Sequence, residues 1–220
     1  MTQDPLAALG GRRIGAHLPL GQGMVKAADR ARSIGATTIQ VFSDNPTAWR
    51  RRAAPPGELP KFRARLVAND VAPLATHAPY LINLAGPGDD FWERSIGVVA
   101  AELVMAAEYG ASFVNMHVGS HLGSGIQAGT IRLATGIVRA FDAEAEARSE
   151  PREASEPRET SEAPAASDGM TVDDELPATA PILVLENSAG SGDGMGSTIE
   201  DLAAILDALD GAGAPMARIG

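Results

Sequence analysis

The chain has 220 residues, of which 45% are hydrophobic, and a formal net charge of −10. This length can bury a core and predicts one domain or at most two, while the lack of cysteine excludes disulfide bonds and thiolate metal sites. No apolar stretch approaches the roughly 20 residues of a membrane span, and the N-terminus lacks a signal-peptide pattern. We therefore expect a cytoplasmic protein that does not contact membranes.

The negative charge is concentrated in one segment. Residues 142–180 carry twelve Asp and Glu against three Arg, a sum of −9, whereas residues 1–80 carry eleven Lys and Arg against five Asp and Glu, a sum of +6. A polyanionic ligand could be tolerated at the basic end of the molecule. Ordinary solvated helix faces would give the same count, so charge alone leaves both interpretations open.

Short apolar runs alternate with helical patterns along the chain. The predicted strands are residues 13–17, 37–42, 72–77, 112–117 and 181–186, and residues 217–220 resemble the start of a sixth. The predicted helices that follow the five strands are residues 23–34, 59–69, 89–109, 125–145 and 198–209. Such alternation is typical of a parallel sheet covered by helices, so the sequence predicts an α/β fold.

Residues 143–180 interrupt this alternation. They are rich in Glu, Pro and Ser, and the sequence Ser-Glu-Pro-Arg-Glu occurs at both 149–153 and 155–159. With few apolar side chains and an excess of one charge, ordering this segment would not be repaid by burial. We predict a disordered acidic insertion inside one domain that spans residues 1–220, and its role as a spacer or a regulatory segment stays open.

Three polar side chains end apolar runs of strand length: His77, His117 and Glu186. The carboxyl ends of parallel strands meet at one edge of a barrel, and two imidazoles with a carboxylate are a ligand set of catalytic zinc. Glu186 is costly to bury unless it binds a cation or a strong donor. A hydrogen-bonded histidine or a solvated strand-end glutamate would give the same pattern, but the recurrence at several strand ends favours a metal site.

Other polar residues follow the same strand ends. His17 ends the first predicted strand. After the second predicted strand, Trp49 is followed directly by three arginines, of which Arg50 is the first. This pair suits base stacking and phosphate contact, although Trp49 could equally cap the barrel. The Gly-rich residues 190–196 match neither the dinucleotide fingerprint nor the P-loop, so we predict a flexible turn and leave a backbone phosphate contact open.

Taken together, five motifs at strand ends resemble those of the endonuclease IV family, zinc-dependent endonucleases for abasic DNA built on a xylose-isomerase-like TIM barrel. The resemblance runs from about residue 13 to residue 209 and is interrupted only by the acidic insertion. The motifs are IGAH at 14–17, Phe42 with Asn45 and Trp49, HAPYLINL at 77–84, NMHVGSH at 115–121 and LENSAG at 185–190.

The resemblance implies a role for each matching residue. His77, His117 and Glu186 would bind one zinc, and Glu186, the catalytic carboxylate, would bridge to a second ion in a family site of up to three. The implied DNA contacts are Tyr80 and Leu81 in the loop that enters the duplex, with Asn45, Trp49 and Arg50. The implied neighbours of the metal site are His17, His121 and Asn187. Thr47 stands where some relatives have a basic residue, which weakens the prediction that a side chain inserts into the DNA at this position.

The implied reaction is hydrolysis of the phosphodiester 5′ to an abasic site, leaving a 3′ hydroxyl, by a monomer acting on double-stranded DNA in base-excision repair. A metal-dependent sugar isomerase or epimerase on the same barrel would also place His and Glu at strand ends. The loop at Tyr80 and the arginines after Trp49 disfavour that alternative. A non-catalytic remnant that binds DNA is the third hypothesis.

A complete barrel of this type needs about 250 residues and eight strands. The chain has material for five strand–helix units, and the ligands that the family places on its last three strands have no counterpart. We therefore expect a partial TIM barrel, which is either a fragment of a longer product or a truncated protein of doubtful activity.

Overall fold

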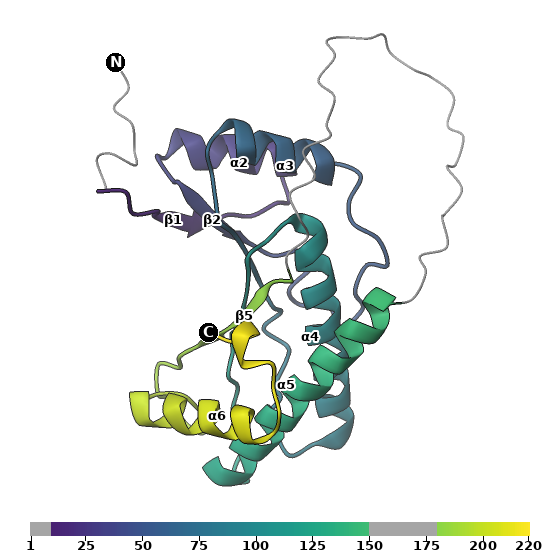
Figure 1. The fold of residues 1–220 in the computed structure, drawn as a ribbon, viewed down its shortest axis with the longest axis vertical. Helices are drawn as coiled ribbons and strands as arrows, with labels where there is room; N and C mark the ends of the chain where they lie inside the picture. The colour runs from purple at the N-terminus through teal and green to yellow at the C-terminus, as the bar shows by residue number, and fades with distance from the viewer. Residues whose placement is uncertain (1–9, 150–179) are drawn as a thin grey trace.

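The computed structural model describes residues 10–149 and 180–220, which fold as one parallel sheet flanked by helices (Figure 1). The five strands pair in chain order, as successive strands of a barrel wall do. The strands are β1 (Gly15–His17), β2 (Thr38–Val41), β3 (Leu74–His77), β4 (Phe113–His117) and β5 (Ile182–Glu186). The helices are α2 (Met24–Ser33), α3 (Leu59–Ala68), α4 (Asp89–Tyr109), α5 (Ile126–Ser149), α6 (Ile199–Gly211) and the 3₁₀ helix η1 (Met216–Arg218).

The α/β prediction is confirmed, because each of the five predicted strand–helix pairs is present within a few residues of its expected ends. Local signals explain this agreement. Gly110 ends α4 in the left-handed conformation with φ of 69°, and Thr198 starts α6 with a capping box to Asp201.

One predicted boundary is wrong. The acidic insertion was expected to begin at residue 143, but residues 143–149 are the last turns of α5. Glu144 is buried there, accepting hydrogen bonds from Arg148 one turn later and from Arg218 at 2.6 and 3.0 Å. The pair with Arg218 holds the helix end against the C-terminal segment. Because it joins residues that are 74 apart in the sequence, local composition does not predict it. The rest of the predicted insertion, up to residue 179, lies outside the described residues.

The predicted sixth strand is only partly observed. Met216–Arg218 forms η1, and Ile219 then makes a single parallel bridge to Leu183 of β5. The backbone N–H of Leu185 donates to the Gly220 carbonyl at 2.8 Å, and that of Gly220 donates to the Leu183 carbonyl at 2.9 Å. The chain therefore lies along β5 over its last two residues.

The hydrophobic core lies between the helices and one face of the sheet. Val41, Val114 and Leu183 are fully buried within it, and residues two apart on a strand share a face. Their neighbours Gln40 and Asn115 lie on the opposite face and are only partly buried. The strands thus present a polar row at their carboxyl ends on the face that the helices do not cover.

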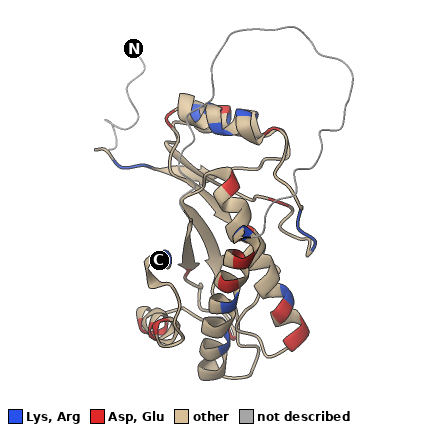
Figure 2. Ribbon diagram, turned by 45° about the vertical axis from the view of Figure 1, so that its right-hand side comes forward, with Lys and Arg blue, Asp and Glu red and all other residues tan. Residues whose placement is uncertain are grey.

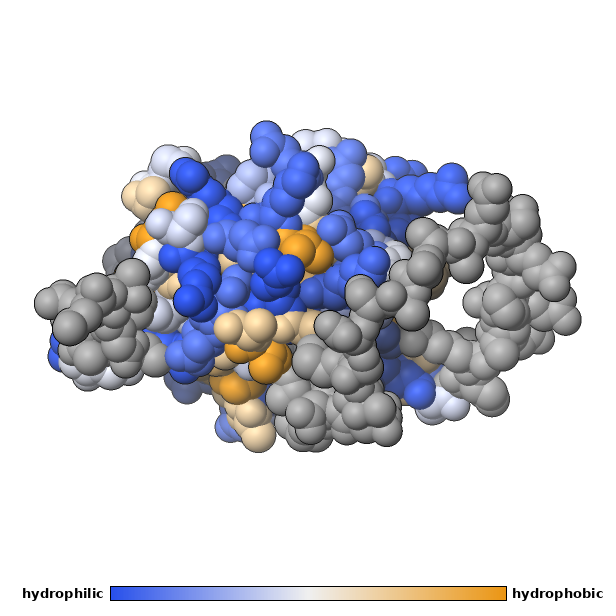
Figure 3. Space-filling view, turned by 90° about the horizontal axis from the view of Figure 1, so that it is seen from above, coloured by the Kyte–Doolittle hydropathy of each residue, from blue (hydrophilic) through white to orange (hydrophobic). Residues whose placement is uncertain are grey.

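The face of the molecule at the end of α2 and α3 is predominantly hydrophilic (Figure 3). Figure 3 views the molecule from the end where α2 and α3 lie, and its blue surface is interrupted by separate orange patches. Figure 2 shows Lys and Arg positions in blue along the helices at this end. Lys26, Arg30 and Lys61 of α2 and α3 are exposed. None of the described helices combines the length and the apolarity needed to cross a bilayer.

Candidate metal centre

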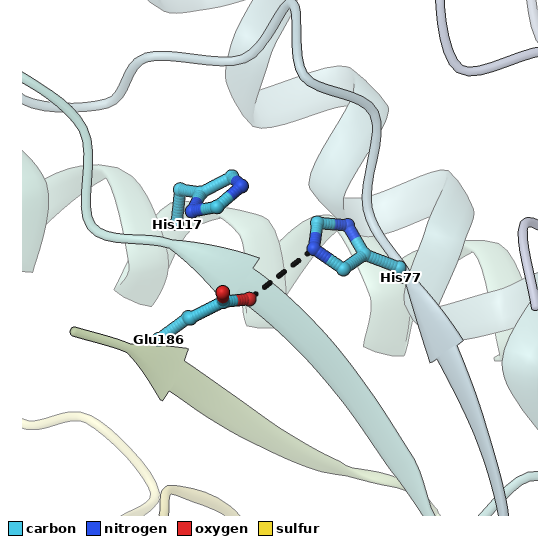
Figure 4. Close-up of side chains that lie close together, drawn as sticks. All are labelled: His77, His117 and Glu186. Carbon is cyan, nitrogen blue, oxygen red and sulfur yellow. Dashed lines mark hydrogen bonds and ion pairs between the residues drawn. The ribbon is translucent and has the colours of Figure 1, made fainter. Parts of the chain in front are cut away.

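The structure brings together the three side chains that end β3, β4 and β5. His77 pairs in register with Asn115, and His117 pairs with Glu186, so the three strand ends lie side by side. One donor atom from each of His77, His117 and Glu186 lies within 4.8 Å of the other two. Figure 4 shows the imidazoles and the carboxylate pointing toward one another. This separation is small enough for all three to reach one ion.

A hydrogen bond to the backbone fixes the orientation of the His77 ring. Its Nδ1 lies 2.6 Å from the Ala78 carbonyl oxygen, which only accepts, so Nδ1 must carry the proton. In the neutral ring, Nε2 then presents a lone pair toward Glu186 Oε2 at 3.3 Å. Two acceptors at this distance need a proton or a cation between them. A backbone carbonyl that fixes the tautomer is the usual partner of a metal-binding histidine.

Glu186 has a different environment from that of an ordinary surface carboxylate. Its Oε2 accepts a hydrogen bond from Asn115 Nδ2, and its side chain is 36% exposed. Within residues 10–149 and 180–220, His77 is its only ion-pair partner. Nitrogen and carboxylate donors without thiolate suit zinc or a similar divalent ion, so the residues present fit the metal that the sequence predicted.

Aromatic rings surround the imidazoles. Tyr80 lies 5.5 Å from the ring centroid of His77 and 5.9 Å from that of His117, and Phe42 lies 5.4 Å from His77. Tyr80 is 59% exposed, whereas the adjacent Leu81 is half-buried. Tyr80 therefore packs over the two imidazole rings while much of its own surface stays exposed.

His17 is a neighbour of this group. Its ring lies 5.9 Å from that of His77, and its Nδ1 lies 3.0 Å from Gln40 Nε2, an amide that donates to it. Desolvation lowers the pKa of His17, repulsion from His77 lowers it further, and Glu186 opposes both. The described geometry places His17 beside the three donors without adding it to the set within 4.8 Å.

The loop after β2 holds the other predicted DNA contacts in a compact turn. Asn45 Oδ1 accepts from the backbone N–H and the hydroxyl of Thr47 at 3.0 and 2.9 Å. Trp49 packs edge-on against Phe91 of α4 with ring centroids 4.8 Å apart and is half-buried. This packing favours the structural interpretation of Trp49, as a cap over the core.

The three arginines after Trp49 have different environments. Arg51 pairs with the buried Glu102 of α4 at 2.5 Å, and Arg52 pairs with Asp44 at 3.2 Å. Arg50 is exposed and has no ion-pair partner among the described residues. Sequence reasoning missed Glu102, although helical spacing places it between Val99 and Ala106 on the apolar stripe. Of the three, Arg50 is the arginine left available to a phosphate.

Part of the Gly-rich segment 190–196 forms a structural link to the loop after β4. Gly194 makes an antiparallel bridge to Ser120, and Met195 is fully buried. His121 lies beside this link, with Nε2 4.0 Å from Asp193 Oδ1. Asn187 is exposed next to Glu186 and lines, with His117, a hollow of about 390 Å³. Asn187 therefore lies beside the candidate donors His117 and Glu186, whereas His121 faces the neighbouring loop.

The fold and the site define a class of protein. Residues 28–214 match the family described as the xylose isomerase-like TIM barrel, and the chain belongs to this family. The fold prediction of a partial barrel of this type is thereby confirmed.

Particular relatives are endonucleases by name. The chain is 31% identical over 197 residues to "Probable endonuclease 4" of Methanoculleus marisnigri, covering 90% of this chain and 58% of that protein. The crystal structure of endonuclease IV from Thermus thermophilus superposes with a TM-score of 0.63 at 26% identity, covering 94% of this chain and 74% of that one. The resemblance to endonuclease IV is confirmed. The chain spans about three fifths of the length of the curated relatives it matches.

A sugar epimerase shares the fold. The structure of D-psicose 3-epimerase superposes with a TM-score of 0.57 over 94% of this chain and 62% of that one, at 9% identity. At this identity the similarity shows the architecture alone.

Proposed function

We propose that this protein is a zinc-dependent endonuclease that hydrolyses the phosphodiester 5′ to an abasic site in double-stranded DNA, acting as a monomer. The observation that carries the proposal is the convergence of His77, His117 and Glu186 within 4.8 Å at three adjacent strand ends. The names of the relatives support a nuclease. Because the chain spans about three fifths of their length, incision is proposed for the whole protein and zinc binding for the 220 residues themselves.

The side chains have distinct roles in this proposal. A bound zinc would lower the pKa of water toward neutrality and stabilise negative charge on a phosphate. His77 offers Nε2 because the Ala78 carbonyl holds the proton on Nδ1. Asn115 orients the Glu186 carboxylate by donating to Oε2, and the same carboxylate would help to hold a second ion.

The proposed DNA contacts lie around the same strand ends. Tyr80 offers an exposed ring above the imidazoles, and Leu81 follows it in the same loop. Arg50 offers an unpaired cation for a backbone phosphate, while Asn45 and Trp49 shape the loop that presents it. Selectivity would arise because extruding a nucleotide without a base costs less than unstacking an intact one.

Zinc binding can be tested on the purified 220-residue chain. We expect about one zinc per chain after dialysis, measured by elemental analysis, and a loss of that zinc in Glu186→Gln and His117→Ala. The matched control is Glu200→Gln, which changes an exposed glutamate in the first turn of α6. A wild-type chain without zinc, or an unchanged zinc content in both site variants, would contradict the metal site.

The reaction is tested with a duplex that carries one abasic analogue. We expect cleavage on the 5′ side of the analogue with a 3′ hydroxyl product, and less cleavage when Tyr80→Ala removes the exposed ring. Turnover of free ketoses without incision would instead support the epimerase alternative. Duplex binding without incision by a zinc-loaded whole protein would support the non-catalytic alternative.

A further inference from the structure

The loops that follow β3, β4 and β5 are linked to one another in series. The first link is the side chain of Asn83, in the loop after β3. Its Nδ2 donates to the Ser120 carbonyl at 2.9 Å, while its Oδ1 accepts from the backbone N–H groups of Ser120 and Ala85, both at 3.1 Å. Since N–H groups only donate and a carbonyl only accepts, the orientation of the amide is fixed. Asn83 thus pairs with both backbone groups of Ser120, as a neighbouring strand would.

The second link joins the loop after β4 to the loop after β5. Ser120 bridges Gly194, the Met195 N–H donates to the Gly119 carbonyl at 3.0 Å, and the His121 N–H donates to the Asp193 carbonyl at 3.1 Å. Met195 is fully buried beneath this bridge. The result is a three-layered link, here called the loop staple, formed by the Asn83 side chain and the backbones of 119–121 and 193–195.

Gly119 shows how closely the first two layers approach. Its φ is 89°, in the region that favours glycine, and a Cβ added there would collide with Oδ1 of Asn83. The backbone of the second loop therefore passes directly against the asparagine side chain. A larger residue at 119 would displace the very atom that accepts the Ser120 and Ala85 hydrogen bonds.

We propose that Asn83 is a positioning residue that sets the geometry of the metal centre by holding these loops together; this inference rests on the proposed function. Asn83 follows Tyr80 by three residues, and Ser120 follows His117 by three. The loop staple therefore fixes the segments that leave two ligand-bearing strands, and it holds Tyr80 over the rings of His77 and His117. Through Gly194 and Met195 it also restrains the loop that leaves Glu186.

The test measures zinc affinity and backbone hydrogen exchange in the same set of variants. In Asn83→Ala we expect faster exchange of the Ser120 and Ala85 amides in metal-free protein and zinc binding weakened about tenfold, the low end for groups that orient ligands. Asn83→Asp keeps the shape and both accepting contacts but places an oxygen against the Ser120 carbonyl. We expect this variant to lose less zinc affinity than Asn83→Ala, and it keeps the proposal testable if the alanine variant does not fold.

The matched control is Asn69→Ala. Asn69 lies at the end of α3, and its side chain donates to the Ala28 carbonyl of α2. This variant should leave both zinc affinity and exchange at residues 119–121 unchanged. Gly119→Ala should also weaken zinc binding. The double variant Asn83→Ala, Gly119→Ala should lose less zinc affinity than the two single losses added together, because the new Cβ collides with the Asn83 side chain that the double variant lacks.

The outcomes separate this proposal from the proposed function. Unchanged zinc affinity in both Asn83 variants, with or without faster exchange, would overturn the positioning role. If the wild type binds no zinc, the proposed metal centre fails. In that event the positioning role fails with it. Unaltered hydrogen exchange at residues 119–121 in Asn83→Ala would show in addition that the loop staple itself is absent.

Discussion

Two carboxylates of this molecule have contrasting environments. Glu102 is 1% exposed within α4, accepts from Arg51 at 2.5 Å and from the Ser43 hydroxyl at 2.6 Å, and so has its charge matched inside the chain. Glu186 is 36% exposed and faces an imidazole and an amide. Burial raises the pKa of Glu102, against the opposing effects of Arg51 and Ser43.

The contrast shows how a structural acid differs from a candidate ligand. Glu144 belongs with Glu102, since it is equally buried and pairs with Arg148 and Arg218. The charge of a buried carboxylate that pairs with an arginine is balanced within the fold. Removing the carboxylate leaves the arginine as an uncompensated cation. Glu186 meets no arginine or lysine among the described residues, so a bound cation would complete its environment.

The largest expected effect on stability is at Glu102. Glu102→Ala leaves Arg51, whose side chain is 11% exposed, without its partner, and we expect a loss of about 3–5 kcal/mol in the free energy of unfolding. Denaturant unfolding measures this change. Glu93→Ala, which breaks an exposed pair with Arg139, is the control and should cost much less. Equal losses in the two variants would show that burial does not make the Glu102–Arg51 pair more important for stability than an exposed pair.

A smaller loss is expected at Glu144. Glu144→Ala removes two hydrogen bonds from Arg218, which is 25% exposed and can recover hydration, so we expect roughly 1–3 kcal/mol. The same variant should speed exchange in the last turns of α5 and at residues 218–220. An unaffected helix end would show that Glu144 does not hold the C-terminal segment.

The capping box of α6 should contribute less than either buried acid and in a pH-dependent manner. The Ser197 hydroxyl is the main reason that the pKa of Asp201 is below its ordinary value of 3.8. The stabilisation is therefore complete above the unfolded value and is lost as pH falls through the folded pKa. Asp201→Ala should lower Tm at pH 7, and the difference from wild type should shrink as pH falls below about 3.8. Asp207→Ala, on the exposed face of the same helix, is the control and should lower Tm less at pH 7.

The smallest effect on the metal-free protein is expected at Glu186. Glu186→Gln should change the free energy of unfolding by no more than about 0.5 kcal/mol, because the group is partly solvated and unmatched. With zinc at 100 times Kd the wild type should gain about 2.7 kcal/mol, and the variant should gain little of this. A large loss in the variant without metal would place Glu186 among the structural acids.

Much of this protein could be predicted from its sequence, because the informative signals are local. Apolar runs, Gly110 at a helix end and the Thr198 cap define elements whose ends the structure reproduces. Since parallel strands share one carboxyl edge, His77, His117 and Glu186 were expected to converge once the alternation of strands and helices was recognised.

The tertiary structure alone decided which polar side chains complete the interior. Arg51 reaches Glu102 across 51 residues of sequence, and Asn83 reaches Ser120 across 37. Such partners depend on how helices pack on the sheet and how loops pass one another, which periodicity does not encode. For this reason the sequence left phosphate contact open both for the arginines after Trp49 and for the glycines of 190–196. The folded chain uses Arg51 to neutralise a buried acid and residues 193–195 to link the loop after β5 to the loop after β4.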